Sequence, residues 1–402
     1  MVKEIADPSS RRILRTLYAA GFVTAFGAHA VAANLGRYAL GHHASLLQLG
    51  ILLGLYDGAE VVLKPVFGAL SDRVGARPVL IGGLIGFALA SAGFVAAHQP
   101  NCLGGARFAQ GAAAAAFSPA ASALVALFGG TTRTGRAFGG YGGAKGLGYL
   151  GGPIAGGALV AVGGYPLLFG ILAVMACAVA ALASRFIPAT PPRPRSRETV
   201  VALYRRLRSS TFVVPVAVLA GATAALSAGV GFLPVVGQRH GLGPLATGAV
   251  VSLLAAIAAL VQPRAGAVFD ARHGAAMRYA AAGLGAAGIG FAVAALGHGA
   301  LGLIPAAALI GVGVGVATPL GFASLAHSTP ADRMGQTMGA AEVGRELGDA
   351  GGPLLVGALG AVSLTLGLAG LGGALMAISA MVTRAARRPP GLPSAPPSHP
   401  AS

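Results

Sequence analysis

The feature that most constrains this chain is a series of apolar stretches of about twenty residues or more, separated by short segments rich in Gly, Pro, Arg and His. A stretch of that length can cross a bilayer as a helix, because a helix rises about 1.5 Å per residue. The composition agrees, since 55% of the 402 residues are hydrophobic, 10% are charged and the mean hydropathy is +0.75. These values exclude an ordinary soluble protein and predict an all-α membrane protein.

Twelve such stretches can be placed in the chain. A Pro- and Arg-rich segment over 188–210 divides them into two equal sets. This predicts an N-terminal six-helix bundle over 1–187, a cytoplasmic basic linker over 188–210, a C-terminal six-helix bundle over 211–385 and a disordered tail over 386–402. The twelve helices are expected near residues 14–38, 46–70, 79–98, 103–128, 136–162, 166–187, 211–236, 245–268, 276–297, 301–326, 335–360 and 362–384.

The basic residues orient these helices. If both termini are cytoplasmic, the outer side of the membrane holds only two basic residues, Arg37 and Arg239. Inner loops are enriched in Lys and Arg, so the chain is predicted to be a multi-pass protein of the plasma or inner membrane with both termini cytoplasmic. The net charge of +17 is spread over these loops, so no nucleic-acid partner is expected.

The two halves repeat one another. The segment KGLGYLGGPIAGGAL from Lys145 aligns with RELGDAGGPLLVGAL from Arg345 at an offset of 200 residues. Pro65, Gly68 and Asp72 find Pro263, Gly266 and Asp270 at an offset of 198. Two separate blocks that repeat at nearly the same offset indicate that the second half arose by duplication of the first. Since each copy has an even number of spans, the copies are expected to face the same way about an axis along the membrane normal.

The segment GALSDRVGAR after the second predicted span has the residues of a conformational latch. Gly75 permits a tight turn, Asp72 can accept hydrogen bonds from the N-terminal amides of a facing helix, and Arg73 can pair with a carboxylate. The alternative is a basic loop that only sets the orientation. The latch residues are predicted to be Gly68, Asp72, Arg73, Gly75 and Arg77.

The fifth predicted span carries a row of glycines. Gly148, Gly152 and Gly156 share one helix face and can form a groove for another helix, while Pro153 removes one backbone hydrogen bond and allows a kink. Gly157 completes this helix-packing motif. This row could take part in the conformational change, and the alternative is that it serves helix packing alone.

Two predicted spans contain several ionisable residues, which are costly inside a bilayer and therefore indicate function. Counted from the inner end of the second span, Lys64 lies ~9 Å, Glu60 ~15 Å and Asp57 ~20 Å deep. On the eleventh span the corresponding depths are ~9 Å for Glu342, ~14–16 Å for Arg345 and Glu346, and ~20 Å for Asp349. The depths on the two spans match turn by turn.

Three further polar residues lie in other spans. Arg107 could tune a nearby carboxyl group or extend to the lipid headgroups. Lys145 is expected to face a central cavity, where it could attract an anionic group. His29 is expected to be buried on an apolar face, with a role in proton transfer as the less favoured alternative.

Three motifs on the appropriate spans together resemble those of the major facilitator superfamily. GALSDRVGAR resembles the family's motif A, Arg107-Phe108-Ala109-Gln110-Gly111 resembles motif B, and the glycines around Gly152-Pro153 resemble motif C, which in the family marks antiporters. Ala76 departs from the basic residue usual in motif A, and Asn34-Leu35-Gly36-Arg37 stands where the family has a proline signature.

The resemblance implies that the second and eleventh spans meet between the two bundles. Lys64 is then expected near Glu342, and Glu60 near Arg345. A local pair of Glu60 and Lys64 at i, i+4 is the alternative. After pairing, carboxyl groups remain in excess, so one of Asp57, Glu346 and Asp349 is expected to carry a proton, with Asp57 the leading candidate.

The sequence therefore predicts a secondary active transporter that works by alternating access and couples efflux of a small organic molecule, such as a drug or metabolite, to protons. Proton-coupled uptake of an anionic metabolite is the alternative, and a non-transporting membrane receptor on the same scaffold is another. An enzyme and a cofactor are not expected, because no nucleophile–base pair and no metal-ligand spacing is present.

Overall fold

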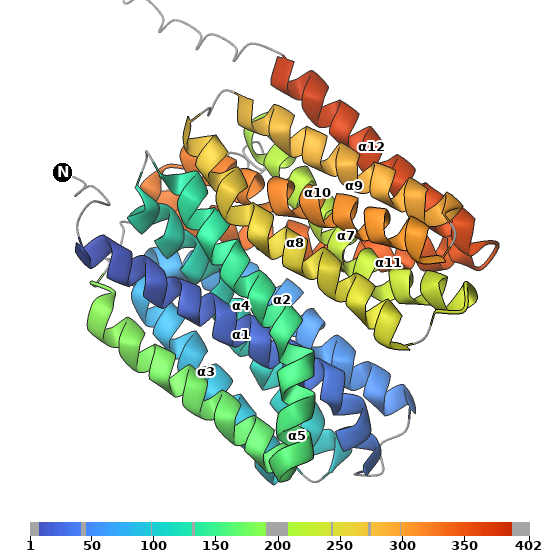
Figure 1. The fold of residues 1–402 in the computed structure, drawn as a ribbon. Helices are drawn as coiled ribbons and strands as arrows, with labels where there is room; N and C mark the ends of the chain where they lie inside the picture. Colours follow the sequence, from blue (N-terminus) through green and yellow to red (C-terminus); the bar gives the residue numbers. More distant parts are fainter. Residues whose placement is uncertain are drawn as a thin grey trace, which may run out of the picture.

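The computed structural model describes residues 8–41, 46–97, 99–130, 133–189, 208–242, 244–271, 275–297 and 299–387. Within these ranges the chain is helical apart from short connections, and the helices lie side by side in two groups (Figure 1). Most of the predicted linker and nearly all of the predicted tail lie outside the described residues, so both remain predictions.

The first group of helices comes from the N-terminal half. It comprises α1 (Pro8–Gly41), α2 (Leu46–Val74), α3 (Ala76–Ala96), α4 (Pro100–Gly129) and α5 (Thr134–Phe186). The sequence predicts two separate spans where α5 lies, but the structure joins them through a kink at Gly163 and Gly164. Gly164 has φ 71°, which glycine adopts without the steric cost that a side chain would add.

The second group comes from the C-terminal half. It comprises α7 (Ser210–Arg239), α8 (Pro244–Ala271), α9 (Ala276–Leu296), α10 (Gly299–Ser328), the 3-10 turn η2 (Ala331–Arg333), α11 (Met334–Gly360) and α12 (Leu364–Arg387). With the two arms of α5, the described residues contain all twelve predicted spans. This confirms the all-α fold of two pseudo-symmetric six-helix bundles.

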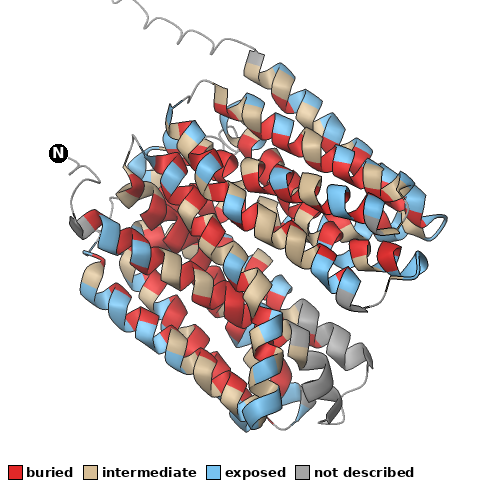
Figure 2. Ribbon diagram, in the orientation of Figure 1, coloured by how far each residue is buried: buried red, intermediate tan, exposed pale blue. Residues whose placement is uncertain are grey.

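Most of these helices suit a membrane by length and composition. Eight of the helices in the described ranges are long and apolar enough to cross one, namely α3, α4, α5, α7, α8, α9, α10 and α12. The charge-bearing α2 and α11 are not among them. Figure 2 shows buried residues along the faces where helices meet and exposed residues on the outer faces.

The two bundles touch along two equivalent helix crossings, α2 with α11 and α5 with α8. Both depend on glycine. A Cβ at Gly68 would lie 2.7 Å from the carbonyl oxygen of Gly335, and a Cβ at Gly266 would overlap the carbonyl group of Gly135. The absence of side chains at these positions lets the helix backbones touch.

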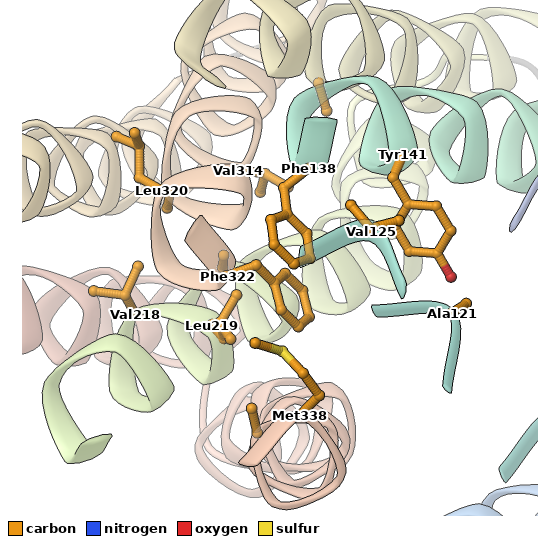
Figure 3. Packing of buried hydrophobic residues seen from close by; sticks show 14 of the residues in the cluster. Ala121, Val125, Phe138, Tyr141, Val218, Leu219, Val314, Leu320, Phe322 and Met338 are labelled. Carbon is orange, nitrogen blue, oxygen red and sulfur yellow. The ribbon is translucent and has the colours of Figure 1, made fainter. Parts of the chain in front are cut away.

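Large side chains fill the space between the two crossings. Phe138 of α5 stacks on Phe322 of α10 with ring centroids 5.4 Å apart, and both rings are buried. Met338 of α11 lies beside Phe322 (Figure 3). We call Phe138, Phe322 and Met338 the plug, because they join the bundles near the ends where α5 and α11 begin.

The glycine row of α5 packs against α1. A Cβ at Gly148 would lie 2.7 Å from the carbonyl oxygen of Phe22, and one at Gly152 would lie 2.6 Å from that of Phe26. Gly156 meets Ala30 in the same way, whereas Gly157 has only Asn34 at 4.0 Å and does not belong to this crossing. Pro153 is exposed on the other face. The row therefore serves helix packing.

Candidate functional site

Five charged side chains from α2 and α11 meet where these helices cross. Lys64 Nζ lies 2.6 Å from Glu346 Oε1, 3.2 Å from Glu60 Oε1 and 3.8 Å from Glu342 Oε2. Arg345 donates to Glu342 Oε2 at 3.0 Å and to Glu346 Oε1 at 2.7 Å. We call these five residues the charge cluster.

The charge cluster is removed from solvent. Lys64 is 0% exposed and Glu342 is 1% exposed. Three carboxyl groups face two cations, so the cluster has a surplus of one acid when all five groups are ionised. Desolvating ions costs several kcal/mol per group and is offset only where the ion pairs and hydrogen bonds are good.

The ion pairs follow the sequence prediction only in part. Lys64 lies near Glu342 as expected, but its shortest contact is with Glu346. Glu60 lies close enough to Arg345 for an electrostatic effect, but its ion pair is the alternative one, with Lys64 at i, i+4, while Arg345 holds Glu342 and Glu346. Sequence reasoning missed Ser122 of α4, whose hydroxyl donates to Glu342 at 3.4 Å. A lone Ser in an Ala-rich helix gives no signal of such a role.

Two more acids lie beyond the charge cluster on the same helix faces. Asp57 lies one turn before Glu60 on α2, and its side chain is exposed. Asp349 lies one turn after Glu346 on α11, is half-buried and accepts a hydrogen bond from Ser227 of α7. An exposed carboxyl group next to a buried charged cluster can exchange protons between water and that cluster.

Of the two alternatives for Arg107, extension to the lipid headgroups is contradicted, because the side chain is buried. It is 3% exposed, its guanidinium lies 4.3 Å from the ring centroid of Tyr56, and it donates to Gln110 at 2.6 Å. Tyr56 is close because its backbone packs against Gly111 of α4. The cation–π contact and the amide keep the charge inside the bundle.

His29 is exposed, contrary to the expectation of a buried histidine. Its neighbours Ala28 and Ala30 are buried, so the ring faces an opening within an otherwise packed helix. Nδ1 lies 3.0 Å from the carbonyl oxygen of Ala25, and the ring lies 4.4 Å from that of Tyr149 on α5. Lys145 lies one turn from Tyr149 and close enough to act electrostatically on His29.

Carboxylates cap two helices across the bundle boundary. Asp72 at the end of α2 accepts from the backbone N–H of Gly335 at 2.8 Å and of Gln336 at 2.7 Å, at the start of α11. Asp270 at the end of α8 accepts from Gly135 at 2.8 Å and Arg136 at 3.0 Å, at the start of α5. Both carboxylates face the positive end of a helix dipole.

The other predicted latch residues behave differently. Gly75 has φ 94° and makes the turn between α2 and α3. Arg77 donates to the carbonyl oxygen of Ser184 within its own bundle. Arg73 is exposed, and within the described ranges it has no ion pair with a carboxylate, so the predicted pairing is wrong. Among the predicted latch residues, Gly68 and Asp72 make the contact between the bundles.

Replacing both caps should weaken the contact between the bundles. A carboxylate cap contributes about 0.5–2 kcal/mol, so we expect Asp72→Asn with Asp270→Asn to increase opening at this end by more than either change alone. Thiol labelling of a cysteine introduced at Met338, behind the caps, measures the opening. Asp332→Asn, at an exposed acid in η2, is the control, and equal labelling of all variants would contradict the role of the caps.

The two crossings differ in charge. With the offsets of the internal repeat, Gln262 of α8 takes the place of Lys64, and Gly142 of α5 takes the place of Glu342. The Gln262 side chain lies directly against Gly142 and is buried. The α2–α11 crossing therefore contains buried ion pairs, whereas at the equivalent place the α8–α5 crossing contains a neutral amide side chain packed against a glycine.

No metal chemistry is indicated by the side chains that the structure describes. Within those ranges, no group of three His, Cys, Asp or Glu residues is arranged to hold a metal ion.

The architecture and the sequence together place the chain in a family. The profile of the Major Facilitator Superfamily matches residues 17–353, which span both bundles, both crossings and the charge cluster. The chain belongs to the Major Facilitator Superfamily. It is thus a multi-pass integral membrane protein of a family of transporters, not of enzymes.

Individual superfamily members resemble the chain over shorter stretches. The protein described as probable actinorhodin transporter of Streptomyces coelicolor is 38% identical over 130 residues, 32% of this chain and 22% of that protein. The tetracycline resistance protein, class C, of Escherichia coli is 35% identical over 113 residues, 28% of either protein. These alignments span less than a third of the relatives' length.

A solved superfamily structure supports the fold over nearly the whole chain. The fucose:proton symporter FucP of Escherichia coli superimposes with a TM-score of 0.77 at 14% identity, covering 94% of this chain and 98% of that one. At this identity the likeness concerns the fold alone.

Proposed function

We propose that the protein is a secondary active transporter that exports a small organic molecule in exchange for protons by alternating access. The observation that carries this proposal is the charge cluster. It has one carboxyl group in excess, it spans a boundary at which the bundles must part, and it lies one turn from the exposed Asp57. Taking up a proton changes the attraction across that boundary, which links protonation to opening.

The relatives support export. They are named as an actinorhodin transporter and a tetracycline resistance protein, and removal of a toxic compound from the cell is one route to resistance. The packing of Gly148, Gly152 and Gly156 on α1 preserves the motif that the family's antiporters share. Small organic molecules and protons are the proposed partners.

We infer that the structure is closed to the cytoplasm and that both termini lie on that side. Both carboxylate caps and the plug lie at the end of the bundles that carries Arg73, Arg77, Arg136 and Arg264. By the positive-inside rule this is the cytoplasmic end. The exposure of His29 and Asp57 deeper in the bundles then corresponds to access from outside.

Removing the exposed acid should uncouple transport from protons. We expect Asp57→Asn to abolish substrate-driven proton movement, because an amide cannot carry the exchanged proton. The measurement uses proteoliposomes with an enclosed pH-sensitive dye and a tetracycline or actinorhodin gradient. Asp332→Asn is the control variant, and unchanged proton movement with Asp57→Asn would remove Asp57 from the pathway.

Uptake of an anionic metabolite is the alternative direction, favoured by Lys145. Accumulation of an anion inside vesicles under an inward proton gradient would support it over export. A non-transporting receptor on this scaffold predicts no flux in either direction, and the same vesicles distinguish it.

A further inference from the structure

Lys145 and Arg345 occupy equivalent positions in the two bundles. Each lies eleven residues after the first residue of its helix, Thr134 in α5 and Met334 in α11, which places it about 17 Å along the helix. They are aligned in the internal repeat, and both helices begin at a carboxylate cap. The duplicated fold thus places one cation from each bundle at the same depth along its helix.

Among the described residues, only one of these cations forms ion pairs with carboxylates. Arg345 holds Glu342 at 3.0 Å and Glu346 at 2.7 Å, whereas the equivalent neighbours of Lys145 are Gly142 and Gly146. Across the part of the chain that the structure describes, Lys145 has no carboxylate within ion-pair distance. Its recorded contact is with the ring of Tyr141, whose centroid lies 5.7 Å from Nζ.

The residues around the two cations also differ, with an aromatic ring near Lys145 where an acid lies near Arg345. One turn further along each helix, Tyr149 takes the place of Asp349. Tyr149 packs on the exposed His29, and Asp349 accepts from Ser227, the residue equivalent to His29. The N-terminal bundle therefore presents an ammonium group beside two aromatic rings, whereas the C-terminal bundle presents a guanidinium group beside three acids.

We propose that the transported molecule is an organic anion, whose anionic group pairs with Lys145 and whose flat apolar part packs on His29 and Tyr149. This rests on the proposed function only in that the protein carries a small molecule, and it does not depend on protons or direction. An ammonium group in a membrane interior is costly without a counter-charge, and the substrate supplies one here.

An orphaned donor lies next to the same site. The Tyr141 hydroxyl is buried and has no hydrogen-bond partner within the described residues. Tyr141 and the Lys145 side chain both lie against Gly21 of α1, where a Cβ would be 2.6 Å from the ring and 3.1 Å from Lys145 Cγ. Glycine at position 21 keeps this space open for both side chains.

The alternative role of Lys145 is to balance the surplus acid of the charge cluster at longer range, since it lies close enough to act electrostatically on Glu342 and Glu60. Glu342 already has Arg345 at 3.0 Å, Lys64 at 3.8 Å and Ser122 at 3.4 Å. A balancing role predicts that loss of Lys145 changes stability without changing which ligand charge is preferred. A substrate-binding role predicts a change in that preference.

The test compares two xanthene dyes of similar shape and opposite charge, fluorescein as the anion and rhodamine 123 as the cation. Binding to the purified full-length protein is followed by dye anisotropy. The wild type should bind fluorescein at least ten-fold more tightly than rhodamine 123, a difference of about 1.4 kcal/mol or more, because only the anion can form a charge-assisted pair with Lys145. Lys145→Gln should lose this preference, Lys145→Arg should keep it, and Arg264→Gln is the exposed control.

Each outcome decides the proposal. Equal or absent binding of the dyes by the wild type, or an unchanged preference in Lys145→Gln, would overturn the anion site. Preference for fluorescein together with absent proton movement in the vesicle assay would leave the anion site standing and refute proton coupling. A lower unfolding midpoint in Lys145→Gln, restored by Lys145→Arg, with the preference for fluorescein unchanged in both would indicate the balancing role and overturn the proposal.

Discussion

Lys64→Met is expected to destabilise the protein by about 3–5 kcal/mol, because removing one partner of a buried ion pair leaves the other charges uncompensated. Lys64 is 0% exposed and lies within 4 Å of Glu60, Glu342 and Glu346. Without it, three buried acids share Arg345. The midpoint of thermal unfolding in detergent should fall clearly below that of the wild type.

A second substitution should restore part of this loss. Lys64→Met combined with Glu346→Gln removes the closest carboxylate of the pair, at 2.6 Å, together with the cation. The double variant should therefore be more stable than Lys64→Met alone. Arg264→Met, at an exposed cation, controls for the loss of a positive charge. Equal melting of Lys64→Met and Arg264→Met would show that the cluster does not stabilise this conformation.

Gly266→Val is expected to hold the protein open at the end that bears the carboxylate caps. A side chain at Gly266 overlaps the carbonyl group of Gly135, so α8 and α5 can no longer touch. Overpacking of this kind costs about 2–3 kcal/mol, which shifts the balance away from the closed state by about 30- to 150-fold. The bundles themselves are unchanged, so the protein should still fold.

Thiol labelling reads out this shift. Met338→Cys in the plug is fully buried in the closed state, and the exposed Cys102 and Cys177 are first replaced by Ser. Labelling at position 338 should rise with Gly266→Val. Gly248→Val on the same helix is the matched control, because a Cβ there meets nothing within 4 Å. If both valine variants label alike, the α5–α8 crossing does not govern closure.

Much of the fold follows from the sequence because apolar length and glycine spacing are local signals. The spans, the duplication and the Asp72 cap needed only helix length, an offset of about 200 residues and the affinity of a carboxylate for a helix N-terminus. The kink at Gly163 and Gly164 differed from the predicted loop because two glycines can turn a helix without ending it.

The ion pairs were harder to predict because depths counted along the backbone ignore side-chain direction. Helical side chains point toward the N-terminus of their own helix. The ends of α2 and α11 that meet at Asp72 are the C-terminus of one and the N-terminus of the other, so the helices are antiparallel. Lys64 and Glu346 therefore extend toward each other across about one turn, and Lys64 reaches Glu346 rather than the residue at its own depth.

The environments of His29 and Arg107 could not be read from the sequence at all. An exposed side chain inside an apolar helix requires an opening between helices, which depends on how the bundles pack. The position of Arg107 depends on Tyr56, which lies on another helix and is brought close by Gly111, one turn from Arg107 on α4. Tertiary contacts, not local pattern, decide both.

The neutral pair of Gln262 and Gly142 has a consequence for how the molecule responds to acidity. A carboxamide keeps the same charge at every physiological pH, so under the proposed proton coupling it is the ion pairs between α2 and α11, and not the buried amide between α8 and α5, that would respond to acidification. Duplication supplied two matching joints, and divergence left Lys64 and Glu342 in the middle of one where the other has Gln262 and Gly142.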